Sequence, residues 1–348
     1  MPEGDGVMAE RPTIHTVART AGVSISTVSQ VMRGRGRISD ETRRKVLRAA
    51  EKVNYVQDRR AAAMRSGESR DIGLLIHNIA NPFNAEVVVG ANAYLEERGY
   101  LVFVLDALDD AARQRRYLQT MMGSSPGGLL WVPAKETDAE TIDWVRINSP
   151  TTVSFLRALS GHPFDHVGID NTRGASLATR HLMELGHRHI AFLGGDHGSD
   201  TILQRVAGYV SALMRGQDAA PIVRECAETK TAAMDAAIAL LDAHPEVTGI
   251  VCNCDVVAAG VTLGLARLGL EPGRDVSVTG FDDIEDARLW SPPLTTIAVD
   301  PKGIGQQLAV ALLERKANLD APVRTVNLPV RLEARASSGR PIRRTQHG

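Results

Sequence analysis

The sequence predicts a small all-helical domain followed by a larger α/β core that contains two doubly wound parallel sheets. Three observations support this fold class. The chain has 348 residues, more than one hydrophobic core usually fills. Residues 13–53 carry short apolar stripes with helical spacing. From Asp71 onward, short apolar runs typical of strands alternate with longer amphipathic segments typical of helices.

Charge is unevenly distributed along the chain. Residues 11–70 contain 14 Arg and Lys against 5 Asp and Glu, a net charge of +9, whereas the whole chain has a formal net charge of −1. A basic segment of this kind favours a partner that carries phosphates. A run of charges by itself more often marks a solvated surface. Whether this segment binds phosphates therefore depends on how it folds.

The sequence shows no export or membrane signal. Its first residues, MPEGDGVMAERP, include acids and no apolar segment, and no apolar run approaches the roughly 20 residues that cross a bilayer. The three cysteines, Cys226, Cys252 and Cys254, are too few for a disulfide framework. We therefore expect a cytoplasmic protein that does not contact a membrane.

Three short helices are predicted in the basic segment. Thr13, Ser24 and Ser39 are each placed to cap a helix, and Gly22 to end the first one. The apolar side chains expected to form the core are Ile14, Val17, Ala18, Ala21, Val23, Val28, Val31, Met32, Val46, Leu47, Ala50 and Val53. This pattern predicts a helix-turn-helix module, in which the second helix presents its first residues to base edges in the DNA major groove.

The rest of the chain reads as strands separated by helices. The predicted strands are DIGLLI, YLVFVLD, GGLLWVP, TTVSF, HVGID, HIAFLGG, TGIVCN, DVSVTGFD and TTIAVD, and Phe83–Arg98 and Asp110–Gly123 are examples of the helices. Apolar strands between helices indicate parallel sheets covered on both faces, and so many units indicate two subdomains. Because ligands bind beyond the carboxyl ends of such strands, the polar residues there are the candidates for binding.

The segment TIHTVARTAGVSISTVSQVM resembles the DNA-binding headpiece of the lactose-repressor (LacI/GalR) family of transcription regulators. The strings VGIDNTRGA, LGHRHIAFLGG, QRVAGY and VTGFDDIEDARLWSPPLTTIAVD resemble the periplasmic-binding-protein-like core of that family. The resemblance covers nearly the whole chain. It implies a tail (1–11), a helix-turn-helix domain (12–56), a hinge helix and linker (57–70), an effector-binding and dimerisation core (71–340) and a second tail (341–348).

Within the core, the resemblance implies two subdomains made of discontinuous segments. One consists of residues 71–170 with about 299–328, and the other of residues 171–298 with about 329–340. The family binds its effector in the cleft between them.

The family's DNA contacts carry over to two sets of positions. Its base-reading positions fall on Ile25, Ser26, Ser29 and Gln30, and its backbone contacts fall near Thr13, Thr27, Arg33, Ser39 and Thr42. Gln30 departs from the family, which often has Arg there. Since Gln pairs with adenine whereas Arg prefers guanine, the operator is expected to differ.

The segment AAAMRSGES falls where the family has a hinge helix that enters the minor groove. Met64 stands where the family's apolar wedge, usually Leu, would be, and Ala61 leaves room for a close helix pair. Gln57 replaces the usual Pro. An ordinary linker is the alternative interpretation.

The family's effector contacts carry over to the strand ends. Arg205 and Asp282 match its sugar-hydroxyl contacts, because a guanidinium and a carboxylate can each bind two neighbouring hydroxyls. The further candidates are Phe83, which could stack on a sugar face, Asn84, Asp170 and Cys254. Cys254 stands where the family often has Asn. A helix cap, a core ring or an ion pair is the structural alternative for each.

Metal and enzyme chemistry find little support in the sequence. Cys252 and Cys254 form a C-x-C pair, but no second cluster of Cys or His accompanies it, so we expect reduced thiols and no metal. The chain contains no Gly-x-Gly-x-x-Gly, no phosphate loop, no HExxH and no GxSxG. No cofactor is therefore predicted.

The sequence thus predicts a homodimeric, sequence-specific DNA-binding regulator, a repressor controlled by a small polar effector such as a sugar. A dimer of headpieces would bind double-stranded DNA at a pseudo-palindromic operator. One alternative is a solute-binding receptor with the same core, which the basic segment and the missing export signal disfavour. The other is an α/β enzyme with an accessory DNA-binding domain, for which no nucleophile, metal set or phosphate loop is found.

Overall fold

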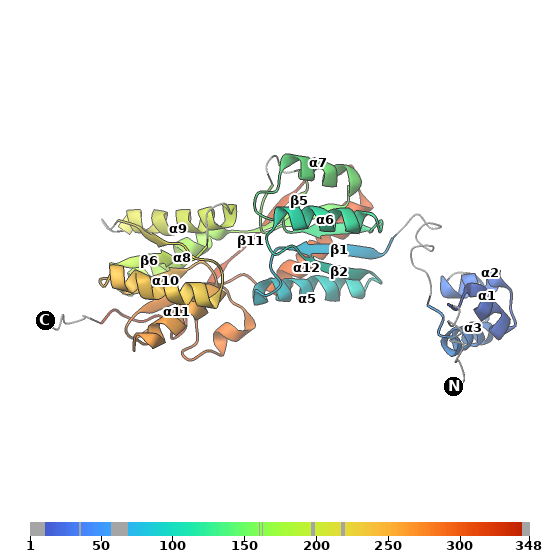
Figure 1. The fold of residues 1–348 in the computed structure, drawn as a ribbon, viewed down its shortest axis with the longest axis horizontal. Coiled ribbons are helices and arrows are strands. Elements are labelled where there is room, and N and C mark those ends of the chain that lie inside the picture. The colour runs from blue at the N-terminus through green and yellow to red at the C-terminus, as the bar shows by residue number, and fades with distance from the viewer. Residues whose placement is uncertain are drawn as a thin grey trace, which may run out of the picture. The chain divides into compact units, whose positions relative to one another are not determined.

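The computed structural model describes residues 11–34, 36–56, 69–159, 161, 163–195, 199–216 and 220–342. The chain divides into two units, Met1–Ser69 and Arg70–Gly348. Each unit has its own hydrophobic core and is described by itself (Figure 1).

The N-terminal unit contains three helices, α1 (Ile14–Ala21), α2 (Ile25–Met32) and α3 (Asp40–Lys52). The predicted caps are confirmed. The side chains of Thr13, Ser24 and Ser39 each accept a hydrogen bond from the backbone N–H three residues later. Gly22 ends α1 in the left-handed conformation, with φ 61°, which glycine adopts without strain.

The core of this unit forms where the three helices meet. Val17, Val28 and Val46 are fully buried, one from each helix. The prediction that Leu47 faces inward is wrong, because its side chain is 49% exposed. Val46, Ala49 and Ala50 follow the i, i+3, i+4 spacing of the buried face, and Leu47 lies one position outside it.

The second unit contains two six-stranded sheets, which confirms the predicted α/β class. The first sheet has the order β11-β5-β4-β3-β1-β2, and all its strands are parallel. Its strands are β1 (Asp71–Ile76), β2 (Leu101–Asp106), β3 (Gly128–Trp131), β4 (Thr152–Phe155), β5 (Asp165–Ile169) and β11 (Thr325–Leu328).

The second sheet has the order β12-β10-β9-β8-β6-β7, in which only β12 pairs antiparallel to its neighbour. Its strands are β6 (Ile190–Leu193), β7 (Ile222–Arg224), β8 (Gly249–Cys252), β9 (Ser277–Asp282), β10 (Thr295–Ala298) and β12 (Arg331–Glu333). The chain passes from the first sheet to the second after β5, returns after β10 and passes again after β11.

Helices cover both faces of each sheet (Figure 1). Around the first sheet lie α5 (Pro82–Glu96) and α12 (Pro301–Ala317) on one face and α6 (Ala111–Met122) and α7 (Ala139–Asn148) on the other. Around the second lie α8 (Asn171–Glu184), α9 (Asp200–Gly216), α10 (Lys230–Ala243), α11 (Asp255–Arg267) and the short helix η1 (Glu285–Arg288). No helix in the described part of the chain is long and apolar enough to cross a membrane.

Candidate functional site

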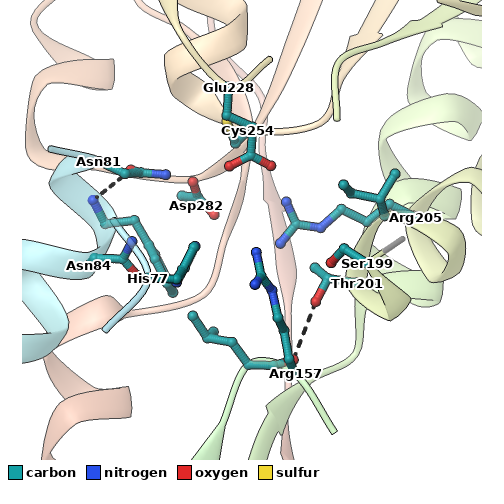
Figure 2. A pocket seen from close by; sticks show the side chains of 13 residues that line it. His77, Asn81, Asn84, Arg157, Ser199, Thr201, Arg205, Glu228, Cys254 and Asp282 are labelled. Atoms are coloured by element: carbon teal, nitrogen blue, oxygen red, sulfur yellow. Dashed lines mark hydrogen bonds between the residues drawn. The ribbon is translucent and has the colours of Figure 1, made fainter. Parts of the chain in front are cut away.

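Side chains at the carboxyl ends of strands from both sheets enclose a cavity of about 450 Å³, a volume that includes some space open to solvent (Figure 2). We call it the inner cavity. Its lining consists of His77, Asn81, Phe83, Asn84, Leu156, Arg157, Ser199, Thr201, Ile202, Arg205, Glu228, Cys254 and Asp282. Ligands bind at this place in doubly wound folds. The cavity brings together five of the six residues predicted from the sequence to contact an effector.

Arg205, on α9, is fixed in place by three contacts. Its Nε donates to Oδ1 of Asn171 at 2.9 Å, its Nη1 donates to the carbonyl of Asn253, and its guanidinium carbon lies 3.6 Å from the centre of the Phe281 ring. Figure 2 shows the guanidinium pointing toward the middle of the cavity. Arg205 therefore presents a buried, pre-oriented hydrogen-bond donor to whatever occupies the cavity.

Asp282 ends β9 with an unusual backbone. Its φ of 127° lies in a region that residues with a side chain rarely adopt, a strain that is typical of functional sites. Burial raises the pKa of its carboxyl well above the ordinary value, the charge of Arg205 opposes the rise, and Asp255 adds to it. Burial also raises the pKa of the neighbouring Asp255 to about 7. Asp282 thus presents a buried carboxyl to the inner cavity.

Two polar atoms on the opposite wall have no hydrogen-bond partner among the described residues. They are Oδ1 of Asn84, whose Nδ2 donates to the carbonyl of Asn78 at 2.6 Å, and Nδ1 of His77. Buried polar atoms in folded proteins are normally satisfied. Burial, assisted by the charge of Arg157, lowers the pKa of His77 to about 3, so its ring is neutral. Both atoms are suited to hydroxyl groups of a ligand.

His77 and Arg157 were not predicted from the sequence, although His77 directly follows β1 and Arg157 is the second residue after β4. Arg157 forms a bidentate ion pair with Asp109, in which Nη2 of Arg157 lies 3.1 Å from Oδ2 of Asp109. Lys135 lies 3.4 Å from the same carboxylate. On the second subdomain, Glu228 accepts from Nδ2 of Asn253 at 2.6 Å. Arg157 is therefore held by an opposite charge, whereas Glu228 is held by a neutral amide.

Asp170 lies outside the lining of the inner cavity. Its Oδ1 accepts from the backbone N–H of Arg173 at 3.0 Å, so it caps α8. Asp170 therefore acts as a helix cap, which was the structural alternative to an effector contact. Phe83, by contrast, lines the cavity and is 5% exposed.

Cys252 and Cys254 are buried thiols, whereas Cys226 is half-buried. Cys252 ends β8 and Cys254 precedes α11, and burial raises the pKa of both thiols well above the ordinary value. No group of His, Cys, Asp and Glu within the described ranges is arranged to hold a metal ion. Cys254 contributes to the lining of the inner cavity as a weakly polar surface.

The residues predicted to read base edges lie on α2. Ile25 is 43% exposed at the start of α2, Ser26 is exposed, and Ser29 and Gln30 are half-buried. The side chain of Gln30 lies against Gly36, where an added Cβ would stand 2.6 Å from its Oε1. Nε of Arg33 donates to the carbonyl of Ser29 at 3.0 Å.

The hydroxyl residues predicted to contact the DNA backbone stand at helix N-termini. Thr13 and Ser39 are caps, Thr27 lies 2.8 Å from the hydroxyl of Ser24, and Thr42 accepts from Ser39 at 2.9 Å. Helix N-termini favour phosphates. The hinge candidates Ala61 and Met64 lie outside the described residues.

Two family models match the chain. Residues 13–58 match the bacterial regulatory proteins of the lacI family, and residues 179–338 match the periplasmic binding protein-like domain. The maltose regulon regulatory protein MalI of Escherichia coli (strain K12) is 31% identical, over 94% of this chain and 98% of its own length. The chain belongs to the lacI family. This confirms the resemblance seen in the sequence and makes the protein a DNA-binding transcription regulator.

Solved structures of lacI-family proteins have the same fold. The lac repressor dimer bound to operator and the anti-inducer ONPF is 26% identical with a TM-score of 0.82, covering 95% of this chain and all of that one. The complex of the transcriptional regulator CelR with cellobiose is 27% identical with a TM-score of 0.70, covering 94% of this chain and all of that one.

Proposed function

We propose that this lacI-family regulator is a dimeric repressor of transcription and that an uncharged, sugar-like ligand in the inner cavity controls its affinity for an operator. The observation that carries the proposal is the placement of unsatisfied polar atoms of Asn84 and His77 opposite the fixed donor of Arg205 and the buried carboxyl of Asp282. A polyol supplies hydroxyls that match both kinds of group. The operator-bound dimer and the cellobiose complex among similar structures support the same proposal.

The cavity walls belong to different subdomains. A ligand that contacts both walls therefore favours one relative position of the two subdomains. Thr201 on α9 donates to the carbonyl of Leu156 at 3.3 Å, and the backbone N–H of Glu285 donates to Glu86 on α5 at 3.1 Å. Such contacts change when the subdomains rotate. The effector then alters DNA affinity by as much as its affinity differs between the two arrangements.

We infer that the cleft binds its ligand without turning it over. The lacI-family proteins that the chain resembles are named as regulators, and the polar groups of the cavity are matched to hydroxyls rather than to a nucleophile and its base. We also place the protein in the cytoplasm with the nucleoid, because its partner is chromosomal DNA.

Calorimetry with candidate sugars, combined with operator titrations of the full chain, tests the proposed function. The operator is first selected from random-sequence duplex DNA. Asp282→Asn replaces one oxygen by an amide donor, so it should weaken sugar binding by about 1–3 kcal/mol and leave operator affinity without sugar unchanged. Asp286→Asn is the matched control, since Asp286 is exposed on η1 and outside the cavity lining. Equal sugar affinity in the two variants would contradict the assignment of the site.

A further inference from the structure

The cleft continues beyond the inner cavity. A second cavity of about 730 Å³, again including space open to solvent, adjoins it at the rim of the first sheet. We call it the outer cavity. His77, Arg157, Ile202 and Glu228 line both cavities. The two cavities therefore adjoin, and these four side chains stand where they meet.

The wall of the outer cavity on the first sheet is polar and held rigidly. Asp109 accepts hydrogen bonds from the backbone N–H of Lys135 at 3.0 Å and from both Nη atoms of Arg157, and it forms an ion pair with Lys135 Nζ at 3.4 Å. Leu108 and Asp109 both have positive φ angles, 50° and 57°. Strained backbone that is fixed by several contacts is a feature of binding sites.

The opposite wall is small and polar, formed by Ala227, Glu228 and Thr229 before α10. Glu228 is engaged by Asn253. Each charged side chain of the outer cavity thus has an opposite charge or an amide beside it. Such a lining suits an uncharged ligand with many hydroxyls better than an anion or an apolar group.

We propose that the effector spans both cavities and is an uncharged disaccharide, with one ring in the inner cavity between Arg205 and Asp282 and the second ring in the outer cavity beside Asp109 and Ala227. This inference rests on the proposed sugar control of the regulator and adds the size of its ligand. A monosaccharide would fill the inner cavity alone and would leave the contacts of the outer cavity unused.

The test compares disaccharides with their own component sugars by calorimetry on the full chain. The probes are maltose, cellobiose and lactose, with glucose and galactose as the components. At least one disaccharide should bind about tenfold or more tightly than either of its components. Ala227→Trp places a bulky ring in the outer cavity and should remove this advantage while leaving monosaccharide affinity unchanged. Ala220→Trp is the matched control, an exposed alanine that lines neither cavity.

The possible outcomes separate the two proposals. If a monosaccharide binds as tightly as its disaccharides, with an affinity that falls in Asp282→Asn and is unchanged in Ala227→Trp, the disaccharide assignment is overturned and the sugar site stands. If no probe binds, or if Asp282→Asn has no effect on the probe that does, the proposed sugar control fails as well. A disaccharide affinity that falls equally in Ala227→Trp and Ala220→Trp also overturns the assignment of the outer cavity.

Discussion

Arg205 is stacked on Phe281, with its guanidinium carbon 3.6 Å from the centre of the ring. The stack fixes the plane of the guanidinium, and the bonds to Asn171 and Asn253 fix its rotation within that plane. The donor that faces the inner cavity is therefore oriented before a ligand arrives, which lowers the entropy lost on binding.

Arg205→Lys should weaken effector binding although the positive charge is kept. An ammonium group has neither the planar fork nor the face that stacks on Phe281, so it cannot satisfy Asn171, Asn253 and a ligand together. We expect a loss of about 1.5–3 kcal/mol, the range for hydrogen bonds to charged groups. Calorimetry with a sugar that binds the wild type measures it. Unchanged affinity would show that a point charge at this position is sufficient.

Gly174→Ala should weaken effector binding from a distance. A Cβ at Gly174 on α8 would stand 2.5 Å from Cε2 of Phe281, so the ring would have to move and Arg205 with it. Overpacking of this kind destabilises a fold by about 1–3 kcal/mol. Thermal unfolding and calorimetry measure the two effects, and Arg173→Ala, at an exposed position next to it, is the control. A variant that loses stability but keeps full sugar affinity would contradict the proposed support of Arg205 by Phe281.

Gln30→Ala and Arg33→Ala should differ in how they affect operator binding. Gln30 lies on α2 at a position predicted to read a base edge, so its loss should relax preference at one position of each half-site, by about 1–3 kcal/mol against the preferred base. Arg33 is exposed at the end of α2, so its loss should weaken all sequences alike and reduce the salt dependence. Titrations over operator variants and salt concentrations test both. A uniform loss in both variants would show that the register of the recognition helix is wrong.

The sequence predicts those parts of the protein whose signals are local. The caps Thr13, Ser24 and Ser39 and the stretches of apolar strand identify the headpiece and most of both sheets. Strands β7, β11 and β12 were not predicted, because they are short, contain no fully buried residue and lack an apolar run. Their places in the sheets come from pairing with distant strands.

The residues of the candidate site also fall into those that the sequence predicts and those that only the fold brings together. Arg205 and Asp282 stand in motifs that the sequence shows, whereas His77, Arg157 and Glu228 enter the cleft only because loops from separate strands meet there. The position of His77 directly after an apolar strand was an available signal. Asp170 and Asp282 both stand at strand ends, so strand-end position alone does not distinguish the first, which caps a helix, from the second, which lines the cavity.

Asp165 and Arg315 form a buried ion pair that holds the returning segment of the chain against the first sheet. Arg315 on α12 lies 2.7 Å from Asp165 at the start of β5, and their side chains are 7% and 3% exposed. Asp165 also accepts from the backbone N–H of Arg324 at 2.8 Å, just before β11. The pair therefore joins α12 and β11, which follow the second sheet in sequence, to the sheet that they complete.

Asp165→Asn should reduce the free energy of unfolding by about 3–5 kcal/mol near neutral pH, because it leaves the buried guanidinium of Arg315 without its counter-charge. Burial by itself would raise the pKa of Asp165, but hydrogen bonds from Arg315 and from the backbone of Arg324, with the charge of Arg315, lower it below the ordinary value. The unfolded chain therefore binds this proton more readily than the folded chain does. The stability from the pair is complete above the ordinary carboxyl pKa of about 4 and is lost as pH falls through the lowered value.

Denaturant unfolding of the wild type and of Asp165→Asn, from neutral pH down to the acid range, checks both the size of this effect and its sign. The difference between them should be largest near neutral pH and should shrink as the carboxyl of the wild type is protonated. Asp143→Asn is the matched control, because Asp143 pairs with Arg146 at 3.2 Å on the exposed face of α7, with both side chains mostly in solvent, and should give no measurable change. A difference that grows on acidification would contradict the lowered pKa of Asp165.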